Sequence, residues 1–192
     1  MNFVIDQVIA ETTIKLDQGA SIAVYQPSKD ETQHAINVCL LSVTTGLYLK
    51  FEPATLRHLA LGALFHDLGK SILPPNDNDK AYLHTIYGRE LVSRNNLSPV
   101  ASRIVAEHHE FFNGSGYPKG LSRRNIHPLS RLVCITDYFD NALYECSHTK
   151  KQQDVITEMI DDESNKFDLN LLRAFLGSVR PTELIAEYCP QL

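Results

Sequence analysis

The sequence feature that most constrains the fold is the recurrence of apolar residues at helical spacing along most of the chain. Such spacing is clear from residue 35 to residue 49 and again after residue 53. Pro53, Pro99 and Pro128 each stand where the first turn of a helix is expected, because proline fixes a helical φ and needs no amide partner there. No stretch alternates strongly enough to predict a strand. The pattern therefore predicts an all-α bundle.

Capping signals and loop composition divide this pattern into segments. Ser28, followed by Glu31, resembles a capping box and predicts a helix start near residue 29, and Gly69 is expected to stop the helix that begins at Pro53. The predicted helices cover about residues 3–16, 29–49, 53–69, 82–94, 98–110, 128–145, 151–161 and 169–177, with a last one from Pro181. Residues 1–27 are interpreted as an N-terminal helical extension, and residues 28–192 as one domain.

Charge and composition exclude several classes of function. A net charge of −5 argues against a protein that coats duplex nucleic acid, which requires a basic surface. The longest central apolar run, residues 59–65, is too short to span a bilayer, and the N-terminus lacks the basic region of a signal peptide. The four cysteines form no CxxC pair and are interpreted as buried thiols of a reducing compartment. A cytoplasmic protein with no membrane partner is expected.

Imidazole and carboxylate side chains recur on successive predicted helices. The candidate metal ligands are Asp30, His34, His66, Asp67, His84, His108, His109 and Asp137. Neighbours on a helix point about 100° apart, so His108 and His109 are expected to bind two different ions, roughly 3.5–4 Å apart as in two-metal hydrolases. A carboxylate such as Asp67 can reach between two ions. The set predicts a polynuclear metal centre built from several helices.

Such a centre can activate water for in-line attack on phosphorus. Lys70 is predicted one turn beyond His66 and Asp67, where its ammonium group would neutralise charge on a phosphate oxygen. Alternatively, Lys70 is a solvated cation that favours a helix C-terminus. A role for Lys70 in phosphate chemistry is the preferred interpretation.

Four segments together resemble the HD-GYP domain, a branch of the HD phosphohydrolase superfamily: HDLGK at 66–70, HHEFFNGSGYPKGL at 108–121, IHPLSRLVCITDYFDNAL at 126–143 and NKFDLNLLRAF at 165–175. The resemblance implies about five core helices around two or three divalent ions, often iron and alternatively manganese. It also implies hydrolysis of cyclic di-GMP to pGpG or GMP in bacterial signalling.

The resemblance also gives roles to individual residues. His66 and Asp67 match the HD pair with Asp67 bridging, and Asp67 and Lys70 are the expected catalytic residues. The remaining family ligands match His34, His84, His108, His109 and Asp137, while Asp30 stands where trinuclear members have glutamate. Lys70, Arg131 and Lys150 are the candidates for substrate contact.

The loop that names the family contains Asn113, Gly114, Gly116, Tyr117 and Pro118. The two glycines permit positive φ, and Pro118 fixes the exit of the turn. Tyr117 is expected either to pack locally or to contact a partner such as a diguanylate cyclase domain of the GGDEF type.

The sequence departs from the family pattern in several places. Asn113 replaces an aspartate, the segment between residue 70 and His84 is short, and YECSHTKKQ at 144–152 lacks the family's RPY arginine. Two alternatives to a cyclic dinucleotide phosphodiesterase therefore stay open. One is a weak or inactive metal-binding module that senses nucleotide or binds a partner; the other is an HD-type phosphohydrolase of another nucleotide.

Overall fold

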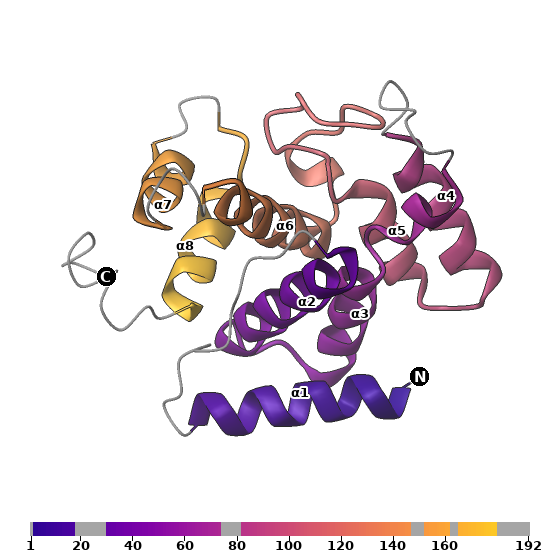
Figure 1. Ribbon diagram of the computed structural model, residues 1–192, viewed down its shortest axis with the longest axis horizontal. Coiled ribbons are helices and arrows are strands. Elements are labelled where there is room, and N and C mark those ends of the chain that lie inside the picture. The colour runs from indigo at the N-terminus through magenta and orange to yellow at the C-terminus, as the bar shows by residue number, and fades with distance from the viewer. Residues whose placement is uncertain (1, 18–29, 74–81, 147–151, 162–164, 180–192) are drawn as a thin grey trace.

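A computed structural model describes residues 2–17, 30–73, 82–146, 152–161 and 165–179, and every regular element in these ranges is helical (Figure 1). The α-helices are α1 (Asn2–Asp17), α2 (Glu31–Tyr48), α3 (Pro53–Leu64), α4 (Leu83–Arg94), α5 (Pro99–Glu107), α6 (Pro128–Cys146), α7 (Gln152–Ile160) and α8 (Leu169–Ser178). Two short 3-10 helices, η1 (Leu68–Ile72) and η3 (Arg123–Asn125), interrupt the connections. The predicted all-α bundle is confirmed.

Helices α2 and α6 lie at the centre of the bundle, with α4 and α5 on one side and α7 and α8 on the other (Figure 1). Val38, Leu59, Ile104 and Leu132, from four different helices, are completely buried in one core. A second core lies between α6, α7 and α8, where the rings of Phe139 and Phe175 meet edge to face at 5.0 Å. The two cores fix the helices that carry the predicted ligands.

Helix α1 packs along α2 and α3 at the edge of the bundle (Figure 1). Its Ile5 is buried in the same core as those helices, and Asp6 accepts a hydrogen bond from Arg57 of α3 at 2.5 Å. The N-terminal helix is therefore a packed part of the bundle. Residues 18–29 and 180–192 lie outside the described residues, so the boundary at residue 27 and the helix from Pro181 stay predictions.

One predicted helix start lies close to the observed one, and one predicted helix end was wrong. Helix α2 begins after Asp30, whose side chain accepts a hydrogen bond from the Gln33 amide at 2.9 Å, whereas Ser28 lies outside the described residues. Helix α3 ends at Leu64 instead of Gly69. Because Gly69 does not cap α3, its lack of a side chain serves another purpose: a Cβ there would lie 2.0 Å from the His84 carbonyl oxygen of α4. Close backbone packing therefore selects this glycine.

Candidate metal centre

Five parts of the fold direct imidazole and carboxylate groups into one interior region. His34 comes from α2, His84 from α4 and Asp137 from α6, and all three side chains are buried. The turn between α3 and η1 adds His66 and Asp67, and the chain at the end of α5 adds His108 and His109. These seven predicted ligands are therefore brought together from segments that lie far apart in the sequence.

Asp67 lies between two groups of histidines. Its Oδ2 is 3.2 Å from Nε2 of His66 and 3.7 Å from Nε2 of His34. Its Oδ1 is 3.3 Å from Nε2 of His84 and 3.7 Å from Nε2 of His108. The two groups, His34–His66–Asp67 and Asp67–His84–His108–His109, each have ligand atoms within 4.8 Å of one another. Asp67 thus has the position of a bridging ligand between two cation sites.

Asp137 makes a similar connection across the centre. One carboxylate oxygen, Oδ1, is 3.1 Å from Nε2 of His34 and 3.6 Å from Nε2 of His66. The other, Oδ2, is 3.6 Å from Nδ1 of His109. Two carboxylates therefore face both histidine groups, an arrangement that offsets part of the charge of two neighbouring divalent ions.

Hydrogen bonds at the far ring nitrogens orient three of the histidines. Nδ1 of His66 donates to the Ala63 carbonyl at 2.7 Å, and Nδ1 of His108 donates to the Val105 carbonyl at 2.9 Å. Nδ1 of His34 donates to Oδ2 of Asp140 at 2.5 Å. In the neutral rings these bonds leave the Nε2 lone pair directed into the centre, the tautomer that metal ligation requires.

The resulting electrostatics suit bound cations. The Nε2 atoms of His34 and His66 lie 3.2 Å apart, and those of His84 and His108 lie 3.3 Å apart. The buried Oδ1 of Asp67 has no hydrogen-bond donor among the described residues. Facing nitrogen acceptors and an unsatisfied carboxylate oxygen are costly to bury, and divalent cations bound between them would satisfy both. The donor set therefore fits divalent metal ions.

Protonation in the absence of metal follows from the same contacts. Burial opposes the charged form of His34, but hydrogen bonds to Asp137 and Asp140 outweigh it and raise its pKa to about 9. Burial and the neighbouring His108 lower the pKa of His109 to about 2, so this ring is neutral at physiological pH. Although burial favours its neutral form, Asp67 keeps a pKa well below the ordinary value because His66 and His108 face it.

A family model described as the HD domain matches residues 32–142, more than half of the chain. The chain belongs to the HD domain family. The match runs from α2 to α6, the part of the chain whose helices and connecting turns carry the seven clustered ligand candidates. The expected HD-domain bundle is thereby confirmed.

Two further comparisons extend this assignment. Over 160 residues, the HD chain is 28% identical to a cyclic di-GMP phosphodiesterase of Pseudomonas aeruginosa, covering 76% of this chain and 38% of the relative. It is also 28% identical to a 3′3′-cGAMP-specific phosphodiesterase of Vibrio cholerae, covering 73% of this chain and 29% of the relative. The chain thus spans less than half the length of these curated relatives.

The fold matches a solved HDG"Y"P protein from Bdellovibrio bacteriovorus with a TM-score of 0.73 and 22% identity, covering 91% of this chain and 61% of that one. The fold expected from the HD-GYP resemblance is therefore confirmed. Within the described residues of the HD chain, no helix has both the length and the apolar character needed to cross a bilayer.

Two of the predicted ligands have positions that the sequence did not predict. Asp30 is exposed at the N-cap of α2, where its carboxylate accepts the Gln33 amide, and it is in neither group of potential metal ligands, so its role as a metal ligand stays a prediction. His108 and His109 belong to the same group instead of two different ones. The 100° separation expected for helical neighbours does not apply, because α5 ends at Glu107 and the two rings lie 4.1 Å apart in the turn that follows.

The predicted substrate-contact residues have different surroundings. Lys70 lies in η1 and forms an ion pair with Asp67, so its ammonium group is at the metal centre. Arg131 instead forms a 2.5 Å ion pair with Asp168, the N-cap residue of α8, and packs over the ring of Phe112. The partly buried Arg131 thus has a structural contact that the sequence did not predict. Lys150 lies outside the described residues.

The loop after α5 is held by side-chain acceptors. Oδ1 of Asn113 accepts hydrogen bonds from the backbone amide and hydroxyl of Ser115, so the amide side chain preserves a loop contact as expected. Gly114 has a φ of +88°, which confirms the prediction for that position. Gly116 does not have positive φ; it is selected because a Cβ would lie 2.2 Å from the carbonyl oxygen of His109.

Tyr117 packs against the metal centre. Its ring lies 4.7 Å from that of His109, and its amide donates to the His109 carbonyl at 3.0 Å. Burial, with Asp137 and Asp67 nearby, raises the pKa of its phenol above the ordinary value. Local packing, one of the two predicted roles of Tyr117, therefore accounts for its position. Pro118 follows it through a cis peptide bond.

Two buried acids that the sequence did not single out support the centre. Asp140 is completely buried and holds both Nδ1 of His34 and Nδ2 of Asn37, the latter at 2.9 Å. Glu110 accepts the amides of Lys119 and Leu121, both at 2.7 Å, and so fixes the loop. The spacing of three between Asp137 and Asp140 on an apolar helix was the available signal, because it places both acids on one face.

Asp140→Asn is expected to weaken metal binding by about 10–100-fold, because the amide holds His34 less strongly and can present the wrong group to Nδ1. The affinity can be measured by competition with a chromogenic chelator. The fold should persist, since the two side chains have nearly the same size. An unchanged affinity in the folded variant would contradict a role for Asp140 in positioning His34.

Metal affinity is expected to increase with pH up to about 9. The pKa of His34 without metal is raised to about 9, so at lower pH a proton must leave before Nε2 can bind a cation. If binding releases one proton, the metal affinity increases roughly tenfold for each unit of pH. Titration of Mn²⁺ by calorimetry, in two buffers of different ionisation enthalpy at pH 7.5, measures this release. Equal heats in both buffers would contradict the prediction.

Proposed function

We propose that this chain is a metal-dependent phosphodiesterase of cyclic di-GMP or a related cyclic dinucleotide. The observation that carries the proposal is the position of Asp67, whose two oxygens face separate histidine groups. A bridged pair of cation sites is typical of enzymes that hydrolyse phosphate esters. The names of the Pseudomonas and Vibrio relatives support cyclic di-GMP and 3′3′-cGAMP as the substrates to consider.

The chain's own residues define how hydrolysis would proceed. Bound divalent cations would supply Lewis acidity and would activate the attacking water. Asp67 and Asp137 would keep the two cation sites adjacent, while Asp140 and the backbone carbonyls would hold the imidazoles in their metal-binding tautomer. In the reaction a water oxygen bonds to phosphorus, the bond from phosphorus to one ribose oxygen breaks, and that oxygen leaves with a proton.

Lys70 would supply positive charge at the reacting phosphate. Its side chain is 39% exposed and its ammonium contacts Asp67, so the group lies between the centre and solvent. With divalent cations held at the centre, the Lys70 ammonium would turn from Asp67 toward a phosphate oxygen on which negative charge develops. We therefore propose Asp67 and Lys70 as the two catalytic residues.

We infer two metal ions, with iron preferred and manganese as the alternative. Histidine nitrogens with bridging carboxylates suit both ions, whereas the absence of cysteine among the ligands disfavours sites selective for soft metals. Asp30 was the expected ligand of a third ion. Its exposed position as the N-cap of α2 supports a binuclear centre instead.

A module that binds nucleotide without efficient turnover is the second candidate. The ion pair between Arg131 and Asp168 favours it, because Arg131 carries the single guanidinium group among the predicted substrate contacts. A GGDEF-type partner and a cytoplasmic location stay predictions.

The deciding experiment is a turnover assay on anaerobically purified protein loaded with iron or manganese. Cyclic di-GMP and 3′3′-cGAMP are supplied separately, and linear products are followed by chromatography. Metal-dependent formation of pGpG or GMP, abolished by a chelator and restored by metal, is the expected result. Nucleotide binding without product in the metal-loaded protein would favour the binding module.

A further inference from the structure

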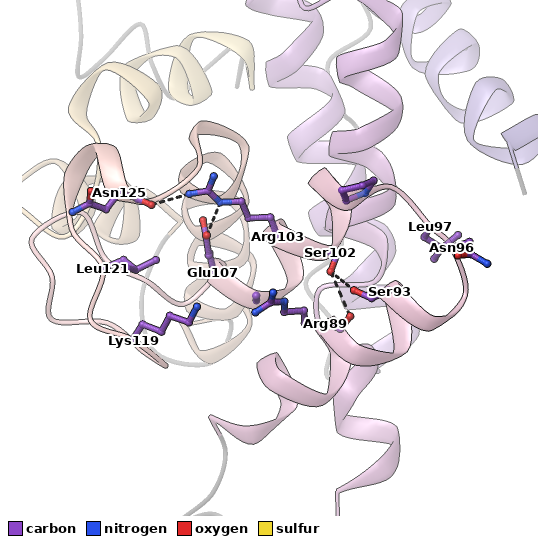
Figure 2. Close-up of a pocket in the computed structure, with 12 residues that line it drawn as sticks. Arg89, Ser93, Asn96, Leu97, Ser102, Arg103, Glu107, Lys119, Leu121 and Asn125 are labelled. Atoms are coloured by element: carbon purple, nitrogen blue, oxygen red, sulfur yellow. Dashed lines mark hydrogen bonds and ion pairs between the residues drawn. The ribbon is translucent and has the colours of Figure 1, made fainter.

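A polar groove of about 850 Å³ lies between α4, α5 and the loop that precedes α6 (Figure 2). Its volume is in the range of small-molecule binding sites. Arg89, Ser93 and Leu97 come from α4 and the turn after it, Arg103 comes from α5, and Lys119 comes from the loop. None of the eight predicted metal ligands lines it. The groove is therefore separate from the metal centre.

The charge of this groove is opposite to that of the whole chain. Arg89, Arg103 and Lys119 line it, and Glu107 is the single acidic residue among the lining residues. Glu107 already accepts hydrogen bonds from Arg103 and from the His127 amide, at 2.6 and 2.8 Å. Arg89 and Lys119 form no ion pair with any described residue. In a chain of net charge −5, these cations are a local excess that an anion would neutralise.

Several contacts hold the cationic side chains of the groove and their neighbours in place before any ligand binds. The Arg103 guanidinium is held by Glu107 and by the Asn125 carbonyl at 2.9 Å, contacts that use two of its five N–H groups. The Lys119 amide is fixed by Glu110, and the hydroxyls of Ser93 and Ser102 lie 2.7 Å apart. In Figure 2 the side chains of Arg89 and Lys119 point toward one another from α4 and the loop.

We propose that this groove is a second binding site, for a small ligand that carries a phosphomonoester or diphosphate group. Guanidinium groups bind phosphate oxygens in pairs, and a lysine adds a compact charge. Arg89 and Lys119, with the remaining N–H groups of Arg103, therefore match a multiply charged anion. Leu97 and Leu121 give the groove apolar surface beside these charges, which a nucleoside attached to the phosphate can contact. A bound ligand would connect α4, which carries His84, with the loop that carries Tyr117.

The test uses the full chain loaded with Zn²⁺, a diamagnetic ion, and follows backbone amides and Arg Nε–H groups by NMR. Inorganic pyrophosphate, GMP and guanosine are titrated separately. The residue-resolved signals separate the groove, reported by Arg89, Asn96 and Asn125, from the metal centre, reported by His84 and His109. Binding therefore can be assigned to the groove whether or not the protein hydrolyses cyclic dinucleotides.

Saturable shifts at the groove are expected for pyrophosphate and GMP, with a Kd below about 1 mM. Tighter binding of GMP would identify a nucleotide site, and equal or tighter binding of pyrophosphate would identify a site for the phosphate group itself. The double substitution Arg89→Ala and Lys119→Ala should weaken binding at least tenfold. Lys50→Ala with Arg173→Ala removes the same charge from exposed positions outside the groove and should leave binding unchanged.

Three results would overturn the proposal. One is the absence of saturation at the groove up to about 10 mM pyrophosphate and GMP, which corresponds to binding too weak for a site. Another is equal binding of guanosine and GMP, which would show that the phosphate is not recognised. The third is an equal loss of binding in the two double variants, which would show an effect of net charge alone.

Discussion

Asp67→Asn is expected to reduce the metal content from two ions per chain to at most one and to lower turnover by more than about 100-fold. Asp67 faces four histidines through its two oxygens and is charged at neutral pH, since its pKa is held well below the ordinary value. Asparagine has nearly the same size but presents one neutral oxygen. It therefore cannot bridge two cations or balance their charge.

Metal content is measured by elemental analysis of the anaerobically loaded protein, together with hydrolysis of cyclic di-GMP. Asp161→Asn is the matched control, because this aspartate is exposed beyond the end of α7 and belongs to neither ligand group. Circular dichroism checks that both variants are folded. Two ions and undiminished turnover in the folded Asp67→Asn protein would refute the bridging role.

Gly69→Ala is expected to destabilise the protein by about 3 kcal/mol or more and to weaken metal binding. The added Cβ would lie 2.0 Å from the His84 carbonyl oxygen and 2.6 Å from the Gly88 nitrogen, and both are backbone atoms of α4. Backbone in a packed helix cannot move aside as a flexible side chain can. The substitution should therefore push η1, with the neighbouring Asp67, away from His84.

Chemical denaturation of the metal-free variant measures the change in the free energy of unfolding, and chelator competition measures metal affinity. The matched control is Gly177→Ala, whose Cβ would meet Tyr48 at 2.9 Å. The exposed Tyr48 side chain can rotate away, and alanine favours the helix, so a much smaller loss is expected there. Similar stabilities of wild type and Gly69→Ala would show that η1 is not constrained by α4.

Helical periodicity predicted the fold well, because it depends on local sequence. Pro53, Pro99 and Pro128 begin α3, α5 and α6 as expected. The errors fall at helix ends near the site. The turn at residues 65–67 and the end of α5 at Glu107 follow from packing against other helices, and no local pattern reports that packing.

The chemistry of the site was also predictable in part. The residue types and their order gave seven predicted ligands that the fold brings together. Asp30 lies at the N-cap of α2, and the sequence does not distinguish its two roles because a carboxylate before a helix is compatible with both capping and ligation. Arg131 was assigned to substrate, but Asp168 of a distant segment is its partner. Asp140 was missed because its role exists only where α6 faces α2.

The sequence by itself determined the all-helical architecture, the HD and GYP motifs and the kind of ligand atoms available, since these depend on side-chain chemistry and local periodicity. Only the tertiary structure decided that Asp67 faces both histidine groups, that His108 and His109 share one of them, and that Arg89 and Lys119 border a common groove. The reason is that these distances join helices remote in sequence, and the packing of whole side-chain surfaces fixes them.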